Sequence, residues 1–317
     1  MADKHEPAQI LAADPAGIAA AAAELRAGHL VALPTETVYG LAGRADRAES
    51  VAAIYRAKGR PDFNPLIVHV PSVEAARAIA QFDARAEQLA AAFWPGALTL
   101  VLPLRPDAAI AAAVTAGLPT IALRCPAHPV MQAVLAASGL PLAAPSANRS
   151  GGVSPTRAAH VAASLGAKAP MILDGGACAA GLESTIVALR ESGTWQVLRP
   201  GPITAAALAA VLGGEPEAVT AAEIEAPGQL ASHYAPGKPV RLNAVEAKTD
   251  EFHIGFGPVA GDISLSPSGD LAEAAARLYA CLHLSAAAPR ARVAIAPVPD
   301  EGIGAAINDR LRRAAHR

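Results

Sequence analysis

The sequence lacks several features that would assign it to a familiar class. Its three cysteines, Cys125, Cys178 and Cys281, are far apart and odd in number, which excludes a disulfide framework and the paired spacing of a zinc site. No Gly-x-x-x-x-Gly-Lys-Ser/Thr segment occurs, so a Walker-type phosphate loop is excluded as well. This cysteine usage predicts a reducing, cytoplasmic environment.

Long hydrophobic runs are also missing. The alanine-rich stretch 19–23 is too short to cross a bilayer. The charged start, residues 1–6, is not followed by the apolar segment that is typical of a secretory leader. We therefore expect a cytoplasmic protein without membrane association.

Neither sign of charge is in clear excess. The chain has 26 Lys and Arg residues against 28 Asp and Glu residues, a formal net charge of −2. Proteins that bind nucleic acid without a partner neutralise phosphates with clustered cations, and no such cluster is present. We expect no strong direct binding to nucleic acid, so a non-catalytic RNA-binding module is the weaker alternative.

Small apolar residues and turn formers are abundant. Apolar residues make up 52% of the chain but aromatic residues only 3%, a balance that favours tight packing of helices on a sheet over a bulky core. The 27 prolines and 26 glycines are spread along the chain and punctuate short elements. A length of 317 residues suits two domains.

Short apolar runs that alternate with helical stretches predict an α/β fold with a twisted mixed sheet in a first domain, residues 1–212. Residues 213–238 lack periodicity and contain several glycines and prolines, which indicates a long linker or lid. A small Rossmann-like α/β domain is expected at 239–317, although it holds no Gly-x-Gly-x-x-Gly segment. Strands are expected at 30–34, 65–70, 97–102, 120–124, 141–144, 170–173, 184–189, 194–199, 239–242, 252–256 and 291–296. Helices are expected at 15–27, 47–58, 127–138, 156–165, 204–212, 270–286 and 302–315, with helical stretches around 72–92.

Polar side chains gather where the first predicted strand ends. Thr35, Glu36 and Thr37 follow strand 30–34, and an open α/β sheet places its ligand crevice at strand ends. Lys58 and Arg60 come about twenty residues later, one residue apart. Hydroxyls that bind a small polar substrate, near cations that neutralise phosphate, favour a nucleotide-dependent enzyme. A Lys-x-Arg pair at a helix end is, by itself, more typical of a solvated face.

Two further residues have open interpretations. Arg124 closes strand 120–124, and a buried guanidinium is costly unless an anion pairs with it. A structural carboxylate and a substrate carboxylate fit this position equally well. His69 lies inside an apolar strand, where an ordinary core histidine is the default. It gains interest because its strand is expected to run beside the one that ends at Thr35.

A turn-rich loop, residues 145–152, follows the strand at 141–144. Its Ser146 and Asn148 lie among glycines whose backbone N–H groups suit an anion nest. An ordinary turn before a helix capped near Ser154 fits these residues as well. Two further groups lie at strand ends: Glu183, Ser184 and Thr185 at the start of strand 184–189, and Arg199 at the end of strand 194–199.

Several segments closely resemble the YrdC-like domain of the L-threonylcarbamoyladenylate synthase family. They are L-P-T-E-T-V-Y-G-L (33–41), Y-R-A-K-G-R-P (55–61), N-P-L-I-V-H-V (64–70), W-P-G-A-L-T-L-V-L (94–102), A-P-S-A-N-R-S-G (144–151), E-S-T-I-V (183–187) and L-R-P-G (198–201). The resemblance covers about residues 15–210 in the family's order and spacing. His-Tyr-Ala-Pro at 233–236 resembles the linker motif of the family's long two-domain form, and residues 304–311 resemble its C-terminal helix.

The resemblance implies one reaction, in which L-threonine, bicarbonate and ATP give threonylcarbamoyl-AMP and pyrophosphate, with Mg²⁺ accompanying ATP. The implied product feeds the tRNA threonylcarbamoyl transferase machinery, which modifies the adenosine next to the anticodon. The implied threonine pocket consists of Thr37, His69, Arg124, Ala144 and Ser184. The implied ATP site consists of Lys58, Arg60, Asn64, Thr120, Ser146, Asn148, Ser154, Arg199 and Tyr234, with Lys58 and Arg60 as the catalytic cations and no residue as a metal ligand.

A second alternative is a carbamoyl-transfer domain. Related YrdC-like domains process carbamoyl phosphate, but they belong to much larger chains with paired cysteines. This sequence has neither the length nor the cysteine pairs, so the alternative is weak.

Overall fold

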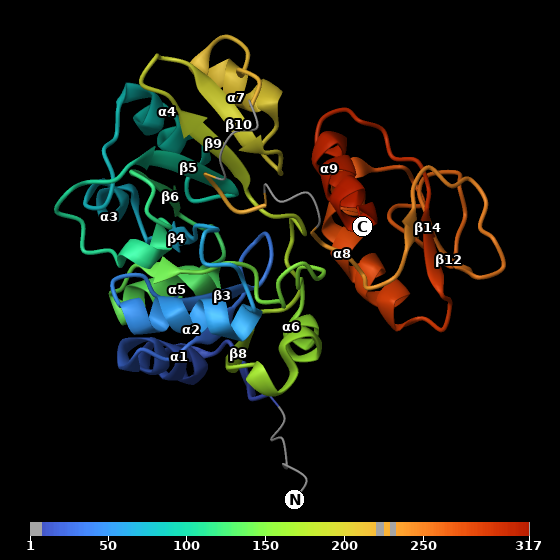
Figure 1. The fold of residues 1–317 in the computed structure, drawn as a ribbon, viewed down its shortest axis with the longest axis horizontal. Coiled ribbons are helices and arrows are strands. Elements are labelled where there is room, and N and C mark those ends of the chain that lie inside the picture. The colour runs from blue at the N-terminus through green and yellow to red at the C-terminus, as the bar shows by residue number, and fades with distance from the viewer. Residues whose placement is uncertain (1–7, 220–224, 229–232, 317) are drawn as a thin grey trace, which may run out of the picture.

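The computed structural model describes residues 8–219, 225–228 and 233–316, and within these ranges the chain forms two α/β units (Figure 1). One unit is built on a ten-stranded mixed sheet and the other on a four-stranded sheet. The predicted fold class, a mixed-sheet domain followed by a small α/β domain, is confirmed. The charged start, residues 1–6, and parts of the expected linker, 220–224 and 229–232, lie outside the described residues.

The larger sheet is mixed because hairpins alternate with crossover connections. Its strands are β1 (Ile10–Ala12), β2 (Val31–Leu33), β3 (Gly40–Arg44), β4 (Ile67–His69), β5 (Leu98–Pro103), β6 (Thr120–Arg124), β7 (Leu142–Ala143), β8 (Met171–Asp174), β9 (Thr185–Leu189) and β10 (Trp195–Arg199). Their order across the sheet is β1-β8-β2-β3-β7-β4-β6-β5-β9-β10. The pairs β1–β8, β2–β8, β4–β6 and β5–β9 are parallel, and the others are antiparallel.

Helices cover both faces of this sheet. They are α1 (Pro15–Ala27), α2 (Ala48–Lys58), α3 (Val73–Arg77), α4 (Ala84–Phe93), α5 (Pro129–Ser138), α6 (Ala158–Leu165) and α7 (Ala205–Leu212), with short 3₁₀ turns at Ala112–Val114 and Gly166–Lys168. One apolar cluster joins Leu25 of α1, Leu33 of β2 and Leu135 of α5. Another joins side chains of α2, α4 and α6 on the opposite face, including Ile54 and Leu89. Burial of these two clusters fixes the sheet between its helices.

The end of α2 shows how local chemistry positions the predicted cations. Gly59 follows the helix with φ 59°, a left-handed conformation that glycine adopts without strain. Its N–H bonds to carbonyls of the last helical turn, and Arg60 N donates to Tyr55 O at 3.0 Å. The helix therefore stops at Lys58, and the chain turns so that Lys58 and Arg60 are both buried.

Three features of the sheet differ from the sequence-based predictions. Strand β3 was not expected, because its two glycines, Gly40 and Gly43, are unfavourable in strands. The prediction that the His69 strand runs beside the strand ending at Thr35 is wrong. Strand β4 lies between β7 and β6, and both β3 and β7 separate it from β2. The short strand β1 was also not expected.

The second unit is smaller and all its strands are parallel. It contains β11 (Val240–Arg241), β12 (Glu251–Gly255), β13 (Ile263–Ser264), β14 (Arg292–Ile295) and the helices α8 (Leu271–Ala287) and α9 (Gly304–Ala315). The strand order is β11-β14-β12-β13. In Figure 1 the helices α8 and α9 face the larger unit, and β12 and β14 lie on the side away from it. Strand β13 is the one element here that the sequence did not predict.

The two units share an apolar core. Val38, Val153 and Leu182 of the larger unit belong to the same buried cluster as Leu278 and Leu311 of the smaller one. Gly181 marks a close approach of the two units, because a Cβ atom there would lie 2.5 Å from Ala276 Cα in α8. No helix in the described part of the chain is both long and apolar enough to span a membrane.

Candidate active site

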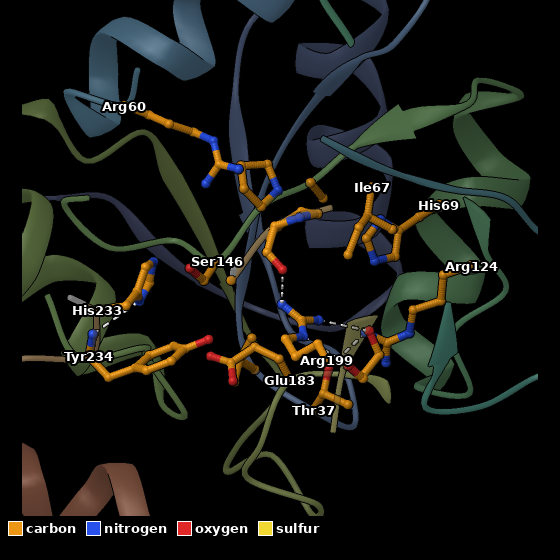
Figure 2. Close-up of a pocket in the computed structure, with 16 residues that line it drawn as sticks. Thr37, Arg60, Ile67, His69, Arg124, Ser146, Glu183, Arg199, His233 and Tyr234 are labelled. Carbon is orange, nitrogen blue, oxygen red and sulfur yellow. Dashed lines mark hydrogen bonds between the residues drawn. The ribbon is translucent and has the colours of Figure 1, made fainter. Parts of the chain in front are cut away.

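A small cavity lies where strand ends of the larger unit meet the linker (Figure 2). Its free volume is about 50 Å³, which is room for a few water molecules. Among the described residues, three guanidinium groups and a single carboxylate line it, a balance that favours an anionic ligand. The lining residues are Thr37, Val38, Arg60, Ile67, His69, Arg124, Ala144, Pro145, Ser146, Glu183, Ser184 and Arg199, with Pro227, Gly228, His233 and Tyr234 from the linker.

The turn after β2 is held by the hydroxyl of Thr35. Its Oγ1 accepts hydrogen bonds from the N–H groups of Thr37 and Val38, both at 3.1 Å. The same oxygen lies 2.7 Å from Val38 O and 2.8 Å from Thr37 Oγ1. This local network fixes the backbone that carries Glu36 and Thr37, so Thr37 reaches the cavity in a defined orientation.

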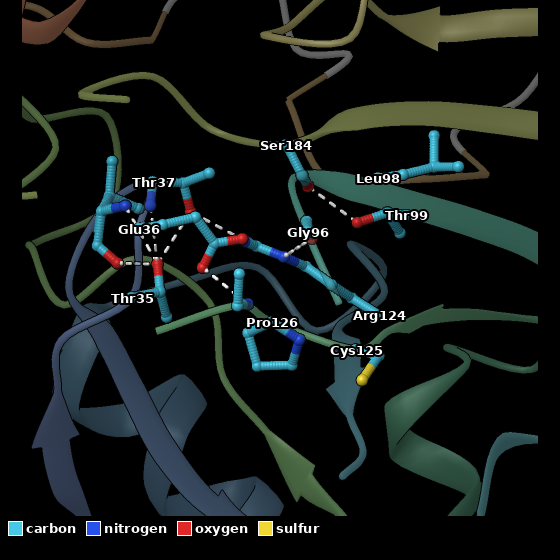
Figure 3. A network of polar contacts seen from close by, with 12 residues as sticks. Thr35, Glu36, Thr37, Gly96, Leu98, Thr99, Arg124, Cys125, Pro126 and Ser184 are labelled. Carbon is cyan, nitrogen blue, oxygen red and sulfur yellow. Dashed lines mark hydrogen bonds and ion pairs between the residues drawn. The ribbon is translucent and has the colours of Figure 1, made fainter. Parts of the chain in front are cut away.

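Arg124 ends β6 and is bound on several sides (Figure 3). Its Nη2 donates to Glu36 Oε1 at 2.6 Å, Nη1 to Thr37 Oγ1 at 2.8 Å, and Nε to Gly96 O at 3.2 Å. Burial raises the pKa of Glu36, but the Arg124 charge and hydrogen bond outweigh this, and the pKa falls below its usual value. Of the two carboxylates that the sequence allowed for Arg124, the structural one is therefore present, and it belongs to Glu36.

The same geometry leaves Arg124 able to bind a ligand carboxylate. Each of its terminal nitrogens has one acceptor in the described part of the chain. A guanidinium nitrogen of this kind carries two hydrogens, so a second donor remains on each. Arg124 thus combines a structural pair with free donors at the cavity.

His69 ends β4 and is buried beside Arg124. Its register partner in β6 is Arg124 itself. Burial, and then the nearby Arg124 charge, lower the pKa of the imidazole to about 3, so the ring is neutral near pH 7. Its Nδ1 is buried without a hydrogen-bond partner among the described residues. A buried polar atom without a partner is costly, which makes this nitrogen a candidate ligand contact.

Arg60 reaches the cavity from the turn after α2. Its Nε donates to Asn64 O at 3.2 Å and its Nη2 to Pro65 O at 2.9 Å. Burial lowers the pKa of this guanidinium to about 10, so it stays charged at neutral pH. The two carbonyls hold the arginine in place and leave its charge uncompensated by any carboxylate bonded to it in the described structure.

Lys58 is placed differently from Arg60. Its Nζ donates to Ser146 O at 2.5 Å and to Asn148 O at 2.6 Å, and it does not line the cavity. Burial, together with the nearby Arg60 charge, lowers the pKa of the ammonium well below its usual value. Lys58 therefore ties the end of α2 to the loop that carries Ser146.

Arg199, at the end of β10, is bound to the backbone and side chain of Ser184. Its Nε donates to Ser184 O at 3.0 Å and its Nη2 to Ser184 Oγ at 3.1 Å. Ser184 Oγ also lies 2.7 Å from Thr99 Oγ1. This chain of contacts fixes a hydroxyl and a guanidinium at the cavity wall.

The structure brings nine of the predicted site residues to the cavity and leaves five outside its lining. The nine are Thr37, Arg60, His69, Arg124, Ala144, Ser146, Ser184, Arg199 and Tyr234. The five are Lys58, Asn64, Thr120, Asn148 and Ser154. Thr120 begins β6, at the opposite end from Arg124. Ser154 does not cap α6, as one interpretation held, but donates to Glu183 Oε1 at 2.5 Å.

Glu183 and His233 line the cavity and were not among the predicted site residues. Both stand directly beside a predicted residue, Glu183 before Ser184 and His233 before Tyr234. The motifs at 183–187 and 233–236 contain Glu183 and His233, so the sequence did indicate both residues. Only the fold shows that these side chains face the same cavity.

The fold and the site together define an α/β protein with a small, cation-lined pocket at strand ends. The family profile described as "Telomere recombination" matches residues 23–201, and the one described as "Threonylcarbamoyl-AMP synthase, C-terminal domain" matches residues 203–316. The threonylcarbamoyl-AMP synthase of Bacillus subtilis is 39% identical over 94% of this chain and 92% of its own length. That of Pyrococcus abyssi is 37% identical over 93% of both.

A solved structure agrees with these sequence relatives. The crystal structure of P. abyssi Sua5 complexed with L-threonine has a TM-score of 0.87 and 35% identity, and the match covers 98% of each chain. The chain belongs to the threonylcarbamoyl-AMP synthase family.

Proposed function

We propose that this protein makes L-threonylcarbamoyl-AMP from L-threonine, bicarbonate and ATP, and releases pyrophosphate. The observation that carries the proposal is the cavity in Figure 2. Arg124 and His69 lie on one side of it, and Arg60 and Ser146 lie on the other. One cavity with separate cationic ends suits an amino acid carboxylate at one end and phosphates at the other, and membership of the synthase family supports this assignment.

The chemistry needs positioning more than a strong base. The neutral amine of threonine and bicarbonate condense to a carbamate with loss of water. A carbamate oxygen then attacks the α-phosphorus of ATP, the bond from that phosphorus to the β-phosphate oxygen breaks, and pyrophosphate leaves. Charge builds up on the leaving group, so cations fixed in a water-poor cavity supply most of the catalysis.

The threonine end is assigned to the residues around Arg124. Its remaining N–H donors pair with the substrate carboxylate. The neutral His69 Nδ1 accepts a hydrogen bond from a substrate N–H or O–H group. Thr37, Ser184 and the backbone near Ala144 complete the pocket.

The phosphate end is assigned to Arg60 and Arg199. Arg60 is the cation that stabilises the leaving pyrophosphate, because it lines the cavity and has no carboxylate bonded to it in the described structure. Lys58 acts there by holding the loop of Ser146 and Asn148. Tyr234 closes the same end from the linker. The roles of Thr120, Asn64, Asn148 and Ser154 in binding ATP remain predictions.

Mg²⁺ is proposed to enter with ATP. The described residues contain no cluster of three or more His, Cys, Asp or Glu side chains that could hold a metal ion. Asn64 Oδ1 and Asn148 Oδ1 are buried and have no partner in the described structure. Amide oxygens suit Mg²⁺ or its bound waters, and the ion usually takes its other ligands from phosphates and water. When bound, it would neutralise charge on the phosphates.

The wider context is part of the proposal. The product is a reactive mixed anhydride that must be passed to an acceptor, and membership of the synthase family points to a tRNA threonylcarbamoyl transferase in the cytoplasm. Residues 1–212 would form the catalytic domain, 213–238 the linker and lid, and 239–317 the C-terminal domain. The proposed lid contributes directly to the cavity, since linker residues such as Tyr234 form part of its wall.

The deciding experiment is pyrophosphate release from ATP with Mg²⁺, with L-threonine and bicarbonate each present or omitted. We expect release only when both are present. Release that needs bicarbonate but not threonine would indicate another carbamoyl acceptor. Absence of turnover, together with salt-sensitive tRNA binding, would favour the RNA-binding alternative.

A further inference from the structure

Glu183 is a buried carboxylate that the reaction described above does not use. It lines the cavity, precedes Ser184 in the sequence, and accepts hydrogen bonds from three donors. Its Oε1 accepts from Ser154 Oγ at 2.5 Å, within the larger unit. Its Oε2 accepts from Tyr279 Oη at 2.7 Å and from Arg310 Nε at 2.9 Å, both in the C-terminal unit.

Arg310, on α9, is the largest fully buried side chain in the described structure. Its Nη1 donates to Asp309 Oδ2 at 2.8 Å, and its Nη2 is buried without a partner among the described residues. A buried guanidinium is costly unless it is well paired, so a purely apolar contact would serve the domain interface better. This cost points to a role beyond holding the domains together.

The linker is part of the same contact set. The guanidinium of Arg310 lies 5.4 Å from the centre of the Tyr234 ring, a cation–π distance, and that ring packs 5.5 Å from Tyr279. Tyr234 has φ 64°, a left-handed conformation that is uncommon for tyrosine. Figure 2 shows Tyr234 and Glu183 pointing toward one another at the cavity wall. Arg310 therefore contacts two side chains that line the cavity without lining it itself.

We propose that Arg310 is a positioning residue through which the C-terminal domain shapes the active site. It fixes the carboxylate of Glu183 and the ring of Tyr234. Ser184 follows Glu183 directly and is bound to Arg199. The position of Glu183 therefore also determines where the Ser184 hydroxyl and the Arg199 guanidinium lie in the cavity wall. The proposal rests on the proposed function, since it concerns the affinity of that site for its substrates.

The pH at which Glu183 takes up a proton offers a measurement that is specific to this proposal. Burial alone raises the pKa of this carboxyl, but the charges of Arg310 and Arg199 and the hydrogen bonds from Ser154 and Tyr279 lower it to about 2. Without Arg310 the effect of burial is less opposed, so Glu183 should take up a proton at a higher pH. The titratable or charged groups that face it are Lys58 and Arg199 of the larger unit, His233 and Tyr234 of the linker, and Tyr279 and Arg310 of the C-terminal unit.

The test uses the full-length chain and four variants: Arg310→Met, Arg310→Lys, Glu183→Gln/Arg310→Met, and Arg312→Met. Arg312 lies on the same helix with a mostly exposed side chain, which makes it a matched control. Binding of L-threonine and of ATP is measured by calorimetry between pH 5.5 and 8.5, and folding is followed by circular dichroism and thermal unfolding.

We expect Arg310→Met to weaken ATP binding about tenfold. This is the loss that results if only about a tenth of the molecules hold the site in its binding-competent arrangement. Its affinity should fall further at acid pH. In the double variant this pH dependence should disappear while the affinity stays low, and Arg312→Met should bind within about twofold of the unaltered protein. Arg310→Lys should lie between these extremes, because it keeps the charge but not the fork of donors.

Three results would overturn the proposal: an Arg310→Met protein with unaltered affinity, a pH dependence that persists in the double variant, or an equal loss in Arg312→Met. If Arg310→Met does not fold, the double variant decides, since it removes both buried charges. Low affinity in that folded variant supports the proposal and unaltered affinity refutes it. If the unaltered protein itself fails to bind threonine or to release pyrophosphate, the proposed function fails instead.

Discussion

Replacement of Arg124 by methionine tests whether the pair with Glu36 is a structural part of the pocket. The variant removes the guanidinium and leaves the Glu36 carboxylate, whose side chain is only 18% exposed. Loss of one partner of a buried ion pair destabilises by about 3–5 kcal/mol. Glu36 keeps its hydrogen bond from Ala127 N at 3.2 Å, so we expect the lower end of that range.

Two companion variants separate charge from geometry. Arg124→Lys keeps a cation near Glu36 but loses the fork that also reaches Thr37 and Gly96, which should cost about 1–2 kcal/mol. Glu36→Gln/Arg124→Met removes both charges, and we expect it to be more stable than Arg124→Met alone by about 2 kcal/mol.

The assay is urea unfolding of the full-length proteins at pH 7, followed by fluorescence and circular dichroism. L-Threonine should raise the unfolding midpoint of the unaltered protein but not that of Arg124→Met, because its proposed carboxylate partner is gone. The reasoning is refuted if the double variant is as unstable as Arg124→Met. A threonine-induced shift of normal size in Arg124→Met would refute the assignment of the carboxylate site.

The pH dependence of the pair has a definite sign. The pKa of Glu36 is lower in the folded protein than the ordinary glutamate value of 4.5. The stability that the pair contributes is therefore fully present above about pH 4.5 and is lost as the pH falls through the lower folded value. Unfolding midpoints of the unaltered protein and Arg124→Met should converge on acidification below pH 4.5.

Three further predictions follow from the site. Arg60→Met should lower the rate of pyrophosphate release about 100-fold or more while threonine still stabilises the protein, and Arg56→Met, which replaces an exposed arginine on the preceding helix α2, should leave the rate nearly unchanged. The pKa of His69 is about 3 in the folded protein and about 6.5 in the unfolded chain, so between these pH values the unfolded state binds more protons. The stability of the protein should therefore fall as the pH drops through 6.5. His69→Gln should make that fall smaller in thermal unfolding. EDTA should abolish pyrophosphate release but leave the melting temperature of the protein without ATP unchanged within about 1 °C, and a larger shift would reveal a metal bound by the protein itself.

The chain's secondary structure could be predicted from local pattern to a large extent. Helix α1 was placed at its observed limits, because Asp14 and Pro15 begin it and Gly28 ends it. Helix α2 and strand β6 were placed within a residue. Strand β3 was missed, because burial between β2 and β7 outweighs the weak strand propensity of its glycines.

The strand order could not be predicted in the same way. The sequence indicates which segments are strands, but pairing depends on contacts between segments far apart in the chain. His69 was expected next to the strand ending at Thr35, whereas β3 and β7 lie between them. Residues 142 and 143 form a strand of two residues, too short for any local pattern to indicate its neighbours.

The sequence by itself determined the α/β class, the linker before a second unit, and the motifs that carry Thr37, Arg60, Arg124 and Ser184, because these depend on residue type and spacing along the chain. Only the tertiary structure decided which of these side chains share a cavity, since that is set by strand order and burial. It turned Lys58 toward two carbonyls and paired Arg124 with Glu36. It also joined Glu183 to Arg310 across 127 residues of sequence, because a buried carboxylate requires a cation that no neighbour in the chain supplies.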